Sequence, residues 1–343
     1  MGPCGVRSAG PSATLATVST MFVRDLQDGA QLDGVLVVRE TELRAKRDGG
    51  QYLRLTLADR TGSVPANVWD DVAAAARVAT VGAAVRVSGR LQVSARYGAE
   101  LKLRGLCAAD PGSYREADLL DGPPRSPAQM EADLRELVGT VQDRDLRRLL
   151  EVVFGEGSAT WARYRAAPAA KHFHQAYRHG LLEHSLSVAQ AVSAISATFA
   201  GIDRDVAVAG ALLHDIGKLD AYAFAGGAIE MTDAGKLQGE IPLGYYRVRR
   251  LVEEIDDFDA RTAEALLHII LSHHGSLEHG SPIVPCTREA TLVHFCDNLG
   301  GRLGSFDRLE KELRSGERWS RFDRALGGGA YFAATVQDAR EAA

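Results

Sequence analysis

The sequence predicts a multidomain protein in which a small all-β barrel precedes an all-α helical bundle. Between residues 31 and 108, short segments alternate apolar and polar residues, a period of two that is typical of half-buried strands. From Pro127 onward, apolar residues recur at a spacing of three and four, which is typical of amphipathic helices. Residues 111–126, between the two patterns, are rich in Pro and Gly and are therefore predicted to form a linker.

The composition is that of an ordinary globular protein. Its 343 residues leave room for two or three domains, and 45% hydrophobic and 25% charged residues are usual for a soluble fold. Because the net charge is −5, any nucleic-acid binding must depend on a local basic face. The longest apolar runs are too short to cross a bilayer. The four cysteines lie far apart without a CxxC pair, which argues against a zinc knuckle and favours a cytoplasmic location.

The two ends of the chain are expected to lie outside the folded domains. Residues 1–20 are small and polar, and they lack the basic start and apolar core of a secretory signal. We therefore expect a disordered N-terminal extension. Met21 is an alternative translation start, a hypothesis that peptides from before Met21 in the native protein would exclude. Residues 333–343 are expected to form a C-terminal tail.

Residues 21–110 are predicted to form the barrel. Five strands are expected, the first beginning at Gln31, with one helix between the third and the fourth strand. The later strands are predicted over 52–57, 63–69, 85–93 and 100–104, and the helix over 72–78. This layout is that of an OB-fold, a small Greek-key barrel that often binds single-stranded nucleic acid.

The barrel also carries candidate contacts to a nucleic-acid strand. Arg86, Lys102 and Arg104 alternate with apolar residues and are predicted to point outward, where they can meet backbone phosphates. Tyr52, Trp69 and Tyr97 are candidate platforms for base stacking. The alternatives are a solvated sheet face for the cations and ordinary core or rim packing for the aromatic rings.

The second domain, residues 127–332, is predicted to be helical, with leading helices in 127–170. Helices are predicted over 130–141, 144–154, 181–199, 205–213, 243–255, 261–272 and 288–299. Beyond these, the oppositely charged pairs Arg308/Glu312 and Glu317/Arg321 predict further solvent-exposed helix.

Potential metal ligands recur near the predicted ends of these helices. A single histidine on an apolar face is more often a core residue than a ligand. An adjacent His-Asp pair, an adjacent His-His pair and a late Asp on an apolar helix together favour a metal centre. These candidates are His184, His214, Asp215, His273, His274 and Asp297. Lys218, one helical turn beyond the His-Asp pair, is either a contact for an anion held there or a solvent-exposed helix end.

These motifs resemble those of the HD-domain superfamily of metal-dependent phosphohydrolases. In chain order, FVRDL, an OB-like barrel, HGLLEHS, LLHDIGK, LSHHGSLEHGSP and DNLGGRL resemble the YhaM-type 3′→5′ exoribonucleases, which couple an OB domain to an HD domain. The resemblance covers residues 21–332 and implies that residues 127–332 form an HD-domain phosphohydrolase. It also implies one or two divalent metal ions as cofactors, with Mn²⁺ or Mg²⁺ favoured and Fe or Zn²⁺ as alternatives.

The resemblance implies metal-binding roles for individual residues. The core ligands that match the family pattern are His184, His214, Asp215 and Asp297. In two-metal relatives the Asp of the His-Asp pair bridges the ions, and His273 or His274 matches a ligand of the second ion. Glu240 stands where relatives typically have a further histidine, so a second site either persists with altered metal preference or is lost.

The resemblance also implies a hydrolytic mechanism. Divalent cations activate a water for in-line attack on a phosphodiester, while Lys218 stabilises charge on the phosphoryl oxygens. Whichever of His273 and His274 is not a ligand is a candidate to protonate the leaving oxygen. His174 is a candidate phosphate contact, whereas Gln175 stands where relatives often have a second histidine.

We therefore expect a cytoplasmic, metal-dependent 3′→5′ exonuclease of single-stranded RNA, with single-stranded DNA as an open second substrate. The barrel would hold the strand while the HD site cleaves its end. One alternative is a nucleotide or cyclic-nucleotide phosphohydrolase, although a mononucleotide does not need a strand-binding barrel. Another is a non-catalytic single-strand-binding protein with a decayed HD site. No membrane partner is expected, and the sequence does not decide whether the chain forms a homo-oligomer.

Overall fold

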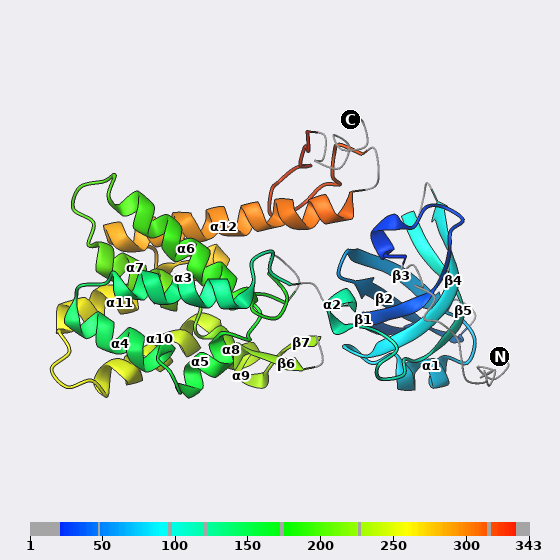
Figure 1. Ribbon diagram of the computed structural model, residues 1–343, viewed down its shortest axis with the longest axis horizontal. Helices are drawn as coiled ribbons and strands as arrows, with labels where there is room; N and C mark the ends of the chain where they lie inside the picture. The colour runs from blue at the N-terminus through cyan, green and yellow to red at the C-terminus, as the bar shows by residue number, and fades with distance from the viewer. Residues whose placement is uncertain are drawn as a thin grey trace, which may run out of the picture. The chain divides into compact units, whose positions relative to one another are not determined.

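The computed structural model describes residues 21–46, 49–94, 98–119, 122–171, 175–225, 228–313 and 317–333. The chain divides into two compact units, Met1–Asp121 and Gly122–Ala343. Figure 1 shows a barrel of strands in the first unit and a bundle of helices in the second. Within the described residues, no helix combines the length and the apolar character that crossing a membrane requires.

The first unit is a closed five-stranded barrel with the strand order β1-β2-β3-β5-β4. Its main elements are β1 (Gln31–Ala45), β2 (Gln51–Asp59), β3 (Gly62–Val68), α1 (Val72–Val78), β4 (Ala84–Ser94) and β5 (Gly98–Ala108), preceded by the 3₁₀ helix η1 (Val23–Asp25). Neighbouring strands pair antiparallel except β3 and β5, whose parallel contact closes the barrel (Figure 1). The predicted OB-fold, with five strands and a helix before the fourth, is confirmed.

The alternation of apolar and polar residues along the strands explains why the strands close around an apolar core. Leu53, Leu55 and Leu57 of β2 are at most 2% exposed, whereas Arg54, between them, is exposed. Burying each leucine stabilises the fold by about 1.5–3 kcal/mol. In β4, Gly89 allows β5 to approach closely, because a Cβ there would lie 2.6 Å from the carbonyl oxygen of Lys102.

The second unit is a bundle of helices around one apolar core. Its helices are α3 (Pro127–Gly139), α4 (Arg144–Phe154), α5 (Ala159–Tyr164), α6 (Gly180–Ser196), α7 (Arg204–Leu213), α8 (Lys218–Ala221), α9 (Asp233–Gln238), α10 (Glu240–Glu253), α11 (Ala260–Ser272) and α12 (Arg288–Glu312). A two-stranded hairpin, β6 (Tyr222–Ala225) and β7 (Ala228–Met231), follows α8, and the 3₁₀ helix η2 (Leu277–His279) follows α11. α6 packs against α7, and both α11 and α12 pack against α7 (Figure 1).

Seven of these helices, α7, α11 and α12 among them, begin at residues that cap their free backbone N–H groups. Asp203, Asp259 and Thr287 precede α7, α11 and α12, and each side chain accepts a hydrogen bond from the first turn. A cap of this kind stabilises a helix by about 0.5–2 kcal/mol. α7 is buried from Val206 to Leu213, so the residues at its C-terminal end lie inside the bundle.

The last helix is longer than predicted. α12 runs without a break to Glu312, whereas the sequence predicts one helix that ends at Leu299 and a separate helix beyond it. Gly300 and Gly301 follow Leu299 and have low helix propensity. In the structure, a Cβ at Gly300 would lie 3.7 Å from Val188 of α6, so the helix passes in contact with its neighbour. Tertiary packing therefore outweighs local propensity here.

The further helix predicted from the charged pairs is confirmed around Arg308, which lies in α12. It is wrong for the described segment after α12, which holds Glu317 and Arg321 and is not helical. This segment contains the isolated bridges Trp319–Tyr331 and Asp323–Gly328 instead. Arg308, which predicted an ion pair along a helix, pairs with Asp323 across the turn. A pair of charges one helical turn apart contributes only about 0.2–0.5 kcal/mol, too little to impose a helix.

Several short elements are absent from the sequence prediction, including α8 and α9 of the second unit. The hairpin of β6 and β7 follows the His-Asp motif, and α2 (Glu116–Leu119) lies within the predicted linker. Leu119 is buried and packs with Val37 and Ala58 of the barrel. Elements of four residues are too short to show a clear period, so hydrophobic patterning cannot identify them.

Candidate metal centre

Five helices, α6, α7, α10, α11 and α12, bring the predicted ligands into one region of the bundle. His184 lies in α6 and Asp297 in α12. His214 and His273 form the C-terminal caps of α7 and α11, and each is followed directly by a further predicted ligand. Because these helices pack on one another, ligands far apart in the sequence meet inside the bundle.

A tight turn fixes the start of α6 and thereby the position of His184. A Cβ at Gly180 would lie 2.0 Å from the carbonyl oxygen of Gln175, so only glycine fits there. His179, the preceding residue, has a φ of 70°. The predicted phosphate contact His174 lies outside the described residues.

The first group of ligand atoms surrounds the Nε2 atom of His184. This atom lies 3.0 Å from Asp297 Oδ1, 3.2 Å from His214 Nε2 and 3.4 Å from Asp215 Oδ2. His214 Nε2 lies 3.4 Å from Asp215 Oδ2 and 3.7 Å from Asp297 Oδ1. Two imidazole nitrogens and two carboxylate oxygens therefore converge on one point.

The second group lies on the other side of Asp215. The Oδ1 atom of Asp215 lies 3.5 Å from His273 Nε2, and His274 Nε2 lies 3.4 Å from Glu240 Oε1. The ligand atoms of Glu240, His273 and His274 all lie within 4.8 Å of one another. Asp215 thus faces the first group with one oxygen and the second group with the other.

Hydrogen bonds to backbone carbonyls fix the tautomers of three of these histidines. The Nδ1 atoms of His214, His273 and His274 each lie 2.8 Å from a carbonyl oxygen, which only accepts hydrogen bonds. In the neutral form, each Nδ1 therefore carries the proton, and each Nε2 presents a lone pair to the ligand groups. Metal-binding histidines in proteins are held in this way.

These donor atoms fit a divalent cation. Ligand atoms that share one ion at about 2.0–2.2 Å lie about 3.0–3.5 Å apart, close to the separations in the first group. Within the part of the chain that the structure describes, the buried Nε2 atom of His273 has no hydrogen-bond partner. Leaving such an atom unsatisfied costs about 1–3 kcal/mol, which a bound cation would remove. Mixed nitrogen and oxygen donors suit Mn²⁺, Mg²⁺, Fe or Zn²⁺ rather than a metal that prefers thiolates.

The electrostatics of the centre also favour an additional positive charge. Burial raises the pKa of the Asp215 carboxyl, but Lys218 and His214 outweigh this effect and hold the pKa well below its usual range. Burial lowers the pKa of His214, yet the adjacent Asp215 and Asp297 raise it to about 9. Without a metal, a proton on His214 therefore partly neutralises the carboxylates. Lys218 donates to Asp215 Oδ2 at 2.7 Å, so it belongs to the centre and not to an exposed helix end.

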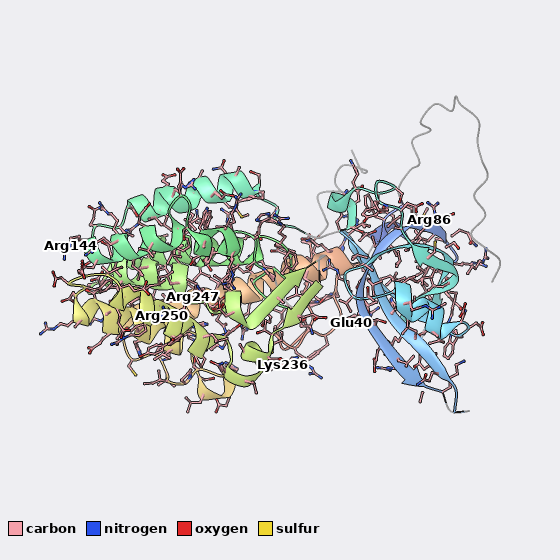
Figure 2. The ribbon with its side chains drawn as sticks, turned by 90° about the horizontal axis from the view of Figure 1, so that it is seen from below. Glu40, Arg86, Arg144, Lys236, Arg247 and Arg250 are labelled. Atoms are coloured by element: carbon pink, nitrogen blue, oxygen red, sulfur yellow. The ribbon has the colours of Figure 1, made fainter. Side chains whose placement is uncertain are left out.

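Several residues that support the centre have no obvious signal in the sequence. Arg247 of α10, labelled in Figure 2, donates to both carboxylate oxygens of Asp220, at 2.6 and 2.8 Å for the shortest contacts. Asp220 also accepts from Arg163, so α5 and α10 hold the short helix that starts at Lys218. Asp220 lies two residues beyond the LLHDIGK motif, which is the only hint that the sequence gives.

Glu183, next to His184, accepts a hydrogen bond from the turn that precedes α6. The hydroxyl of Tyr177 donates to Glu183 Oε2 at 2.6 Å. Burial raises the pKa of the Glu183 carboxyl and outweighs the opposing effect of Tyr177. Glu183 therefore links α6 to the turn before it, which again fixes where His184 lies.

The predicted strand-binding residues all lie on the surface of the barrel. Arg86 (Figure 2) pairs with Asp33 at 2.9 Å, and Lys102 pairs with Glu100 at 2.8 Å. Exposed pairs of this kind contribute only about 0–1 kcal/mol, so a phosphate can replace the carboxylate at small cost. Arg104 is exposed on β5.

The aromatic pair of the barrel is half-exposed. Trp69 is 48% exposed and stacks on Tyr52 with ring centroids 4.5 Å apart. Tyr97, the other candidate platform, lies outside the described residues. Lys46 Nζ lies 5.5 Å from the centroid of the Trp69 ring and donates to the Trp69 carbonyl oxygen. A flat ring with a cation beside it suits both a base and its phosphate.

Comparison with known proteins agrees with both domains. Residues 181–301 match the family model described as the HD domain, and residues 35–106 match that of the OB-fold nucleic acid binding domain. A solution NMR structure of the second OB-fold domain of replication protein A from Methanococcus maripaludis covers 26% of this chain and 94% of its own. Its identity is 20% and its TM-score 0.21. The barrel is therefore assigned from its own strand order and not from this match.

Two curated relatives extend the likeness over most of the chain. The 3′-5′ exoribonuclease YhaM of Geobacillus sp. (strain WCH70) is 28% identical over 290 residues, which are 84% of this chain and 88% of the relative. The protein of the same name from Bacillus subtilis (strain 168) is 28% identical over 297 residues, 84% of this chain and 90% of its own. The resemblance to the YhaM-type exoribonucleases is thus confirmed, and the chain carries an OB-fold barrel followed by an HD domain.

Proposed function

We propose that this chain is a cytoplasmic, metal-dependent 3′→5′ exonuclease that hydrolyses phosphodiester bonds in single-stranded RNA. The observation that carries the proposal is the position of Asp215 between two groups of ligand atoms, with one carboxylate oxygen facing each. Such a shared carboxylate is suited to holding two divalent ions on one phosphodiester. The printed names of the relatives, which are 3′-5′ exoribonucleases, support the substrate class and the polarity.

We assign the ligands to two positions that share Asp215. The first position takes His184, His214, Asp215 and Asp297, and the second takes Asp215, Glu240, His273 and His274. Both His273 and His274 present Nε2 toward the second group. We therefore propose that both bind the cation, and we do not assign either of them to protonation of the leaving oxygen.

The side chains of the centre have separate tasks in the reaction. Divalent cations, when bound, would lower the pKa of a water and place positive charge against the scissile phosphate. Lys218 is 10% exposed and held by Asp215, so its ammonium group stays fixed where negative charge develops on the phosphoryl oxygens. Since the site is largely buried, this charge acts with less screening than it would in water.

The barrel supplies the affinity for a strand. Trp69 would stack on a base, and Arg86, Lys102 and Arg104 would contact successive phosphates. A mononucleotide would gain little from such a surface, which favours a polynucleotide substrate.

A degradation assay with a strand labelled at its 5′ end tests the proposal. The wild-type protein should shorten labelled single-stranded RNA stepwise from the 3′ end with Mn²⁺ or Mg²⁺ and should be inactive with EDTA. Asp215→Ala should lose degradation and keep strand binding, whereas Asp233→Ala, which changes a side chain that is 95% exposed, should keep both. Parallel reactions with labelled DNA, dNTPs and cyclic dinucleotides identify the substrate. Undiminished degradation by Asp215→Ala, or hydrolysis of only the mononucleotides, would overturn the proposal.

A further inference from the structure

The two proposed cation positions differ in their access to solvent. The side chains of His184, His214 and Asp215 are at most 2% exposed, and Asp297 is 18% exposed. At the second position, Glu240 is 19% and His274 is 29% exposed. A cation at the second position would therefore exchange with solvent more readily than one at the first.

The ligands of the second position also come from short or terminal segments. Glu240 is the first residue of α10, and His274 lies just beyond the end of α11. His274 is oriented by its bond to the carbonyl oxygen of His279, in a loop in which Gly275 and Gly280 have φ values of 82° and 91°. In contrast, two of the four ligands of the first position, His184 and Asp297, lie within long helices, so fewer of its ligands depend on terminal segments.

The backbone of Glu240 is nevertheless fixed against the His-Asp motif. A Cβ at Gly217 would lie 2.0 Å from the carbonyl oxygen of Glu240 and 2.5 Å from the amide nitrogen of Gly244. The start of α10 therefore contacts the turn that carries Asp215 and leads into α8 at Lys218. Because of this contact, the position of the Glu240 backbone relative to Asp215 is fixed by the fold.

We propose that Glu240 makes the second position an exchangeable site for a hard divalent cation, while the first position retains its ion. Free Mn²⁺ or Mg²⁺ would then set the fraction of molecules with both positions filled and so regulate the activity. The carboxylate of Glu240 gives the second position a second oxygen ligand, which favours Mn²⁺ and Mg²⁺ over Zn²⁺ relative to an imidazole there. The inference rests on the proposed metal-dependent function only for its regulatory consequence, because cation binding is measurable without nucleic acid.

Calorimetric titration of the metal-free protein with Mn²⁺ tests the inference, with Mn²⁺ electron paramagnetic resonance as a second readout. The wild-type chain should bind two ions in two resolved steps, and the fully loaded form should show the magnetic coupling of ions that share a carboxylate. Glu240→Gln should weaken only the second step, by about 10–100-fold or more, and should remove the coupling. Glu253→Gln changes an exposed glutamate on the same helix and should bind like the wild type.

Metal preference gives an independent check on the role of Glu240. Glu240→His should raise the affinity of the second step for Zn²⁺ relative to Mg²⁺, while the first step stays unchanged. Two ions with equal affinities, one ion only, or loss of both ions in Glu240→Gln would overturn the inference. If two unequal ions bind but no RNA is degraded, the proposed function fails and this inference stands. If RNA is degraded with a single ion bound, this inference fails and the proposed function stands.

Discussion

Replacing Lys218 with methionine removes an ammonium group from the centre and keeps a side chain of similar length. Lys218 Nζ lies 2.7 Å from Asp215 Oδ2, and the two side chains are 10% and 2% exposed. With an effective dielectric constant of about 20, the gross attraction at this distance is about 6 kcal/mol, part of which offsets the desolvation of both groups. Removing one partner of a buried pair costs about 3–5 kcal/mol, because the other charge stays buried. We expect this loss of unfolding free energy in the metal-free protein.

Saturating Mn²⁺ should reduce the loss, since a bound cation opposes the charge of Asp215 in place of Lys218. Thermal unfolding in EDTA and in Mn²⁺ measures both states. For a unit the size of Gly122–Ala343, the expected loss corresponds to a fall in Tm of roughly 6–20 °C in EDTA. Lys236→Met removes a lysine that is 62% exposed and should change Tm by no more than about 1–2 °C. An equal fall in Tm with and without Mn²⁺ would refute the reasoning.

Three further predictions concern the support of the centre and the barrel. Tyr164→Phe removes the hydroxyl that donates to the carbonyl oxygen of Leu212 at 2.8 Å, and urea unfolding should show a loss of about 1–3 kcal/mol; an unchanged unfolding free energy would contradict this. Burial raises the pKa of Asp220, but Arg247 and Arg163 together lower it by more, so the stabilisation exists above the unfolded-state pKa of about 3.9 and disappears as the pH falls through the lower folded-state value. Arg247→Leu should therefore be destabilised at pH 7 and approach the wild type as the pH falls through that lower value, whereas a difference independent of pH would exclude the ion pair as its source. Trp69→Ala should weaken RNA binding by about 1–3 kcal/mol in fluorescence anisotropy with an unchanged salt dependence, and an altered salt slope would argue against stacking.

The barrel was predictable because alternation is a local property of the sequence. Leu53, Leu55 and Leu57 mark the inner face of β2 directly, and the helix before the fourth strand separates the OB-fold from other small barrels. The end of α12 was not predictable in this way, because Gly300 is accommodated by its contact with Val188 in a different helix. Local propensity carries no information about such a contact.

The candidate centre was predictable in its members but not in its arrangement. The His-Asp and His-His pairs identify ligands because burying these groups without a partner is costly. Their division into two groups depends on which oxygen of Asp215 faces which histidine, and this follows only from the packing of the helices. The roles of Asp220 and Arg247 depend likewise on contacts between distant helices, so neither residue stands out in the sequence.

Anomalous diffraction from crystals of the wild-type protein grown with Mn²⁺ tests the central claim most directly. Data collected at the Mn absorption edge should show a strong peak bounded by His184, His214, Asp215 and Asp297, and a weaker peak beside Glu240 and His274. The weaker peak should grow as the Mn²⁺ concentration is raised. Crystals with no peak between His184 and Asp297, or with cations bound only elsewhere, would contradict the account.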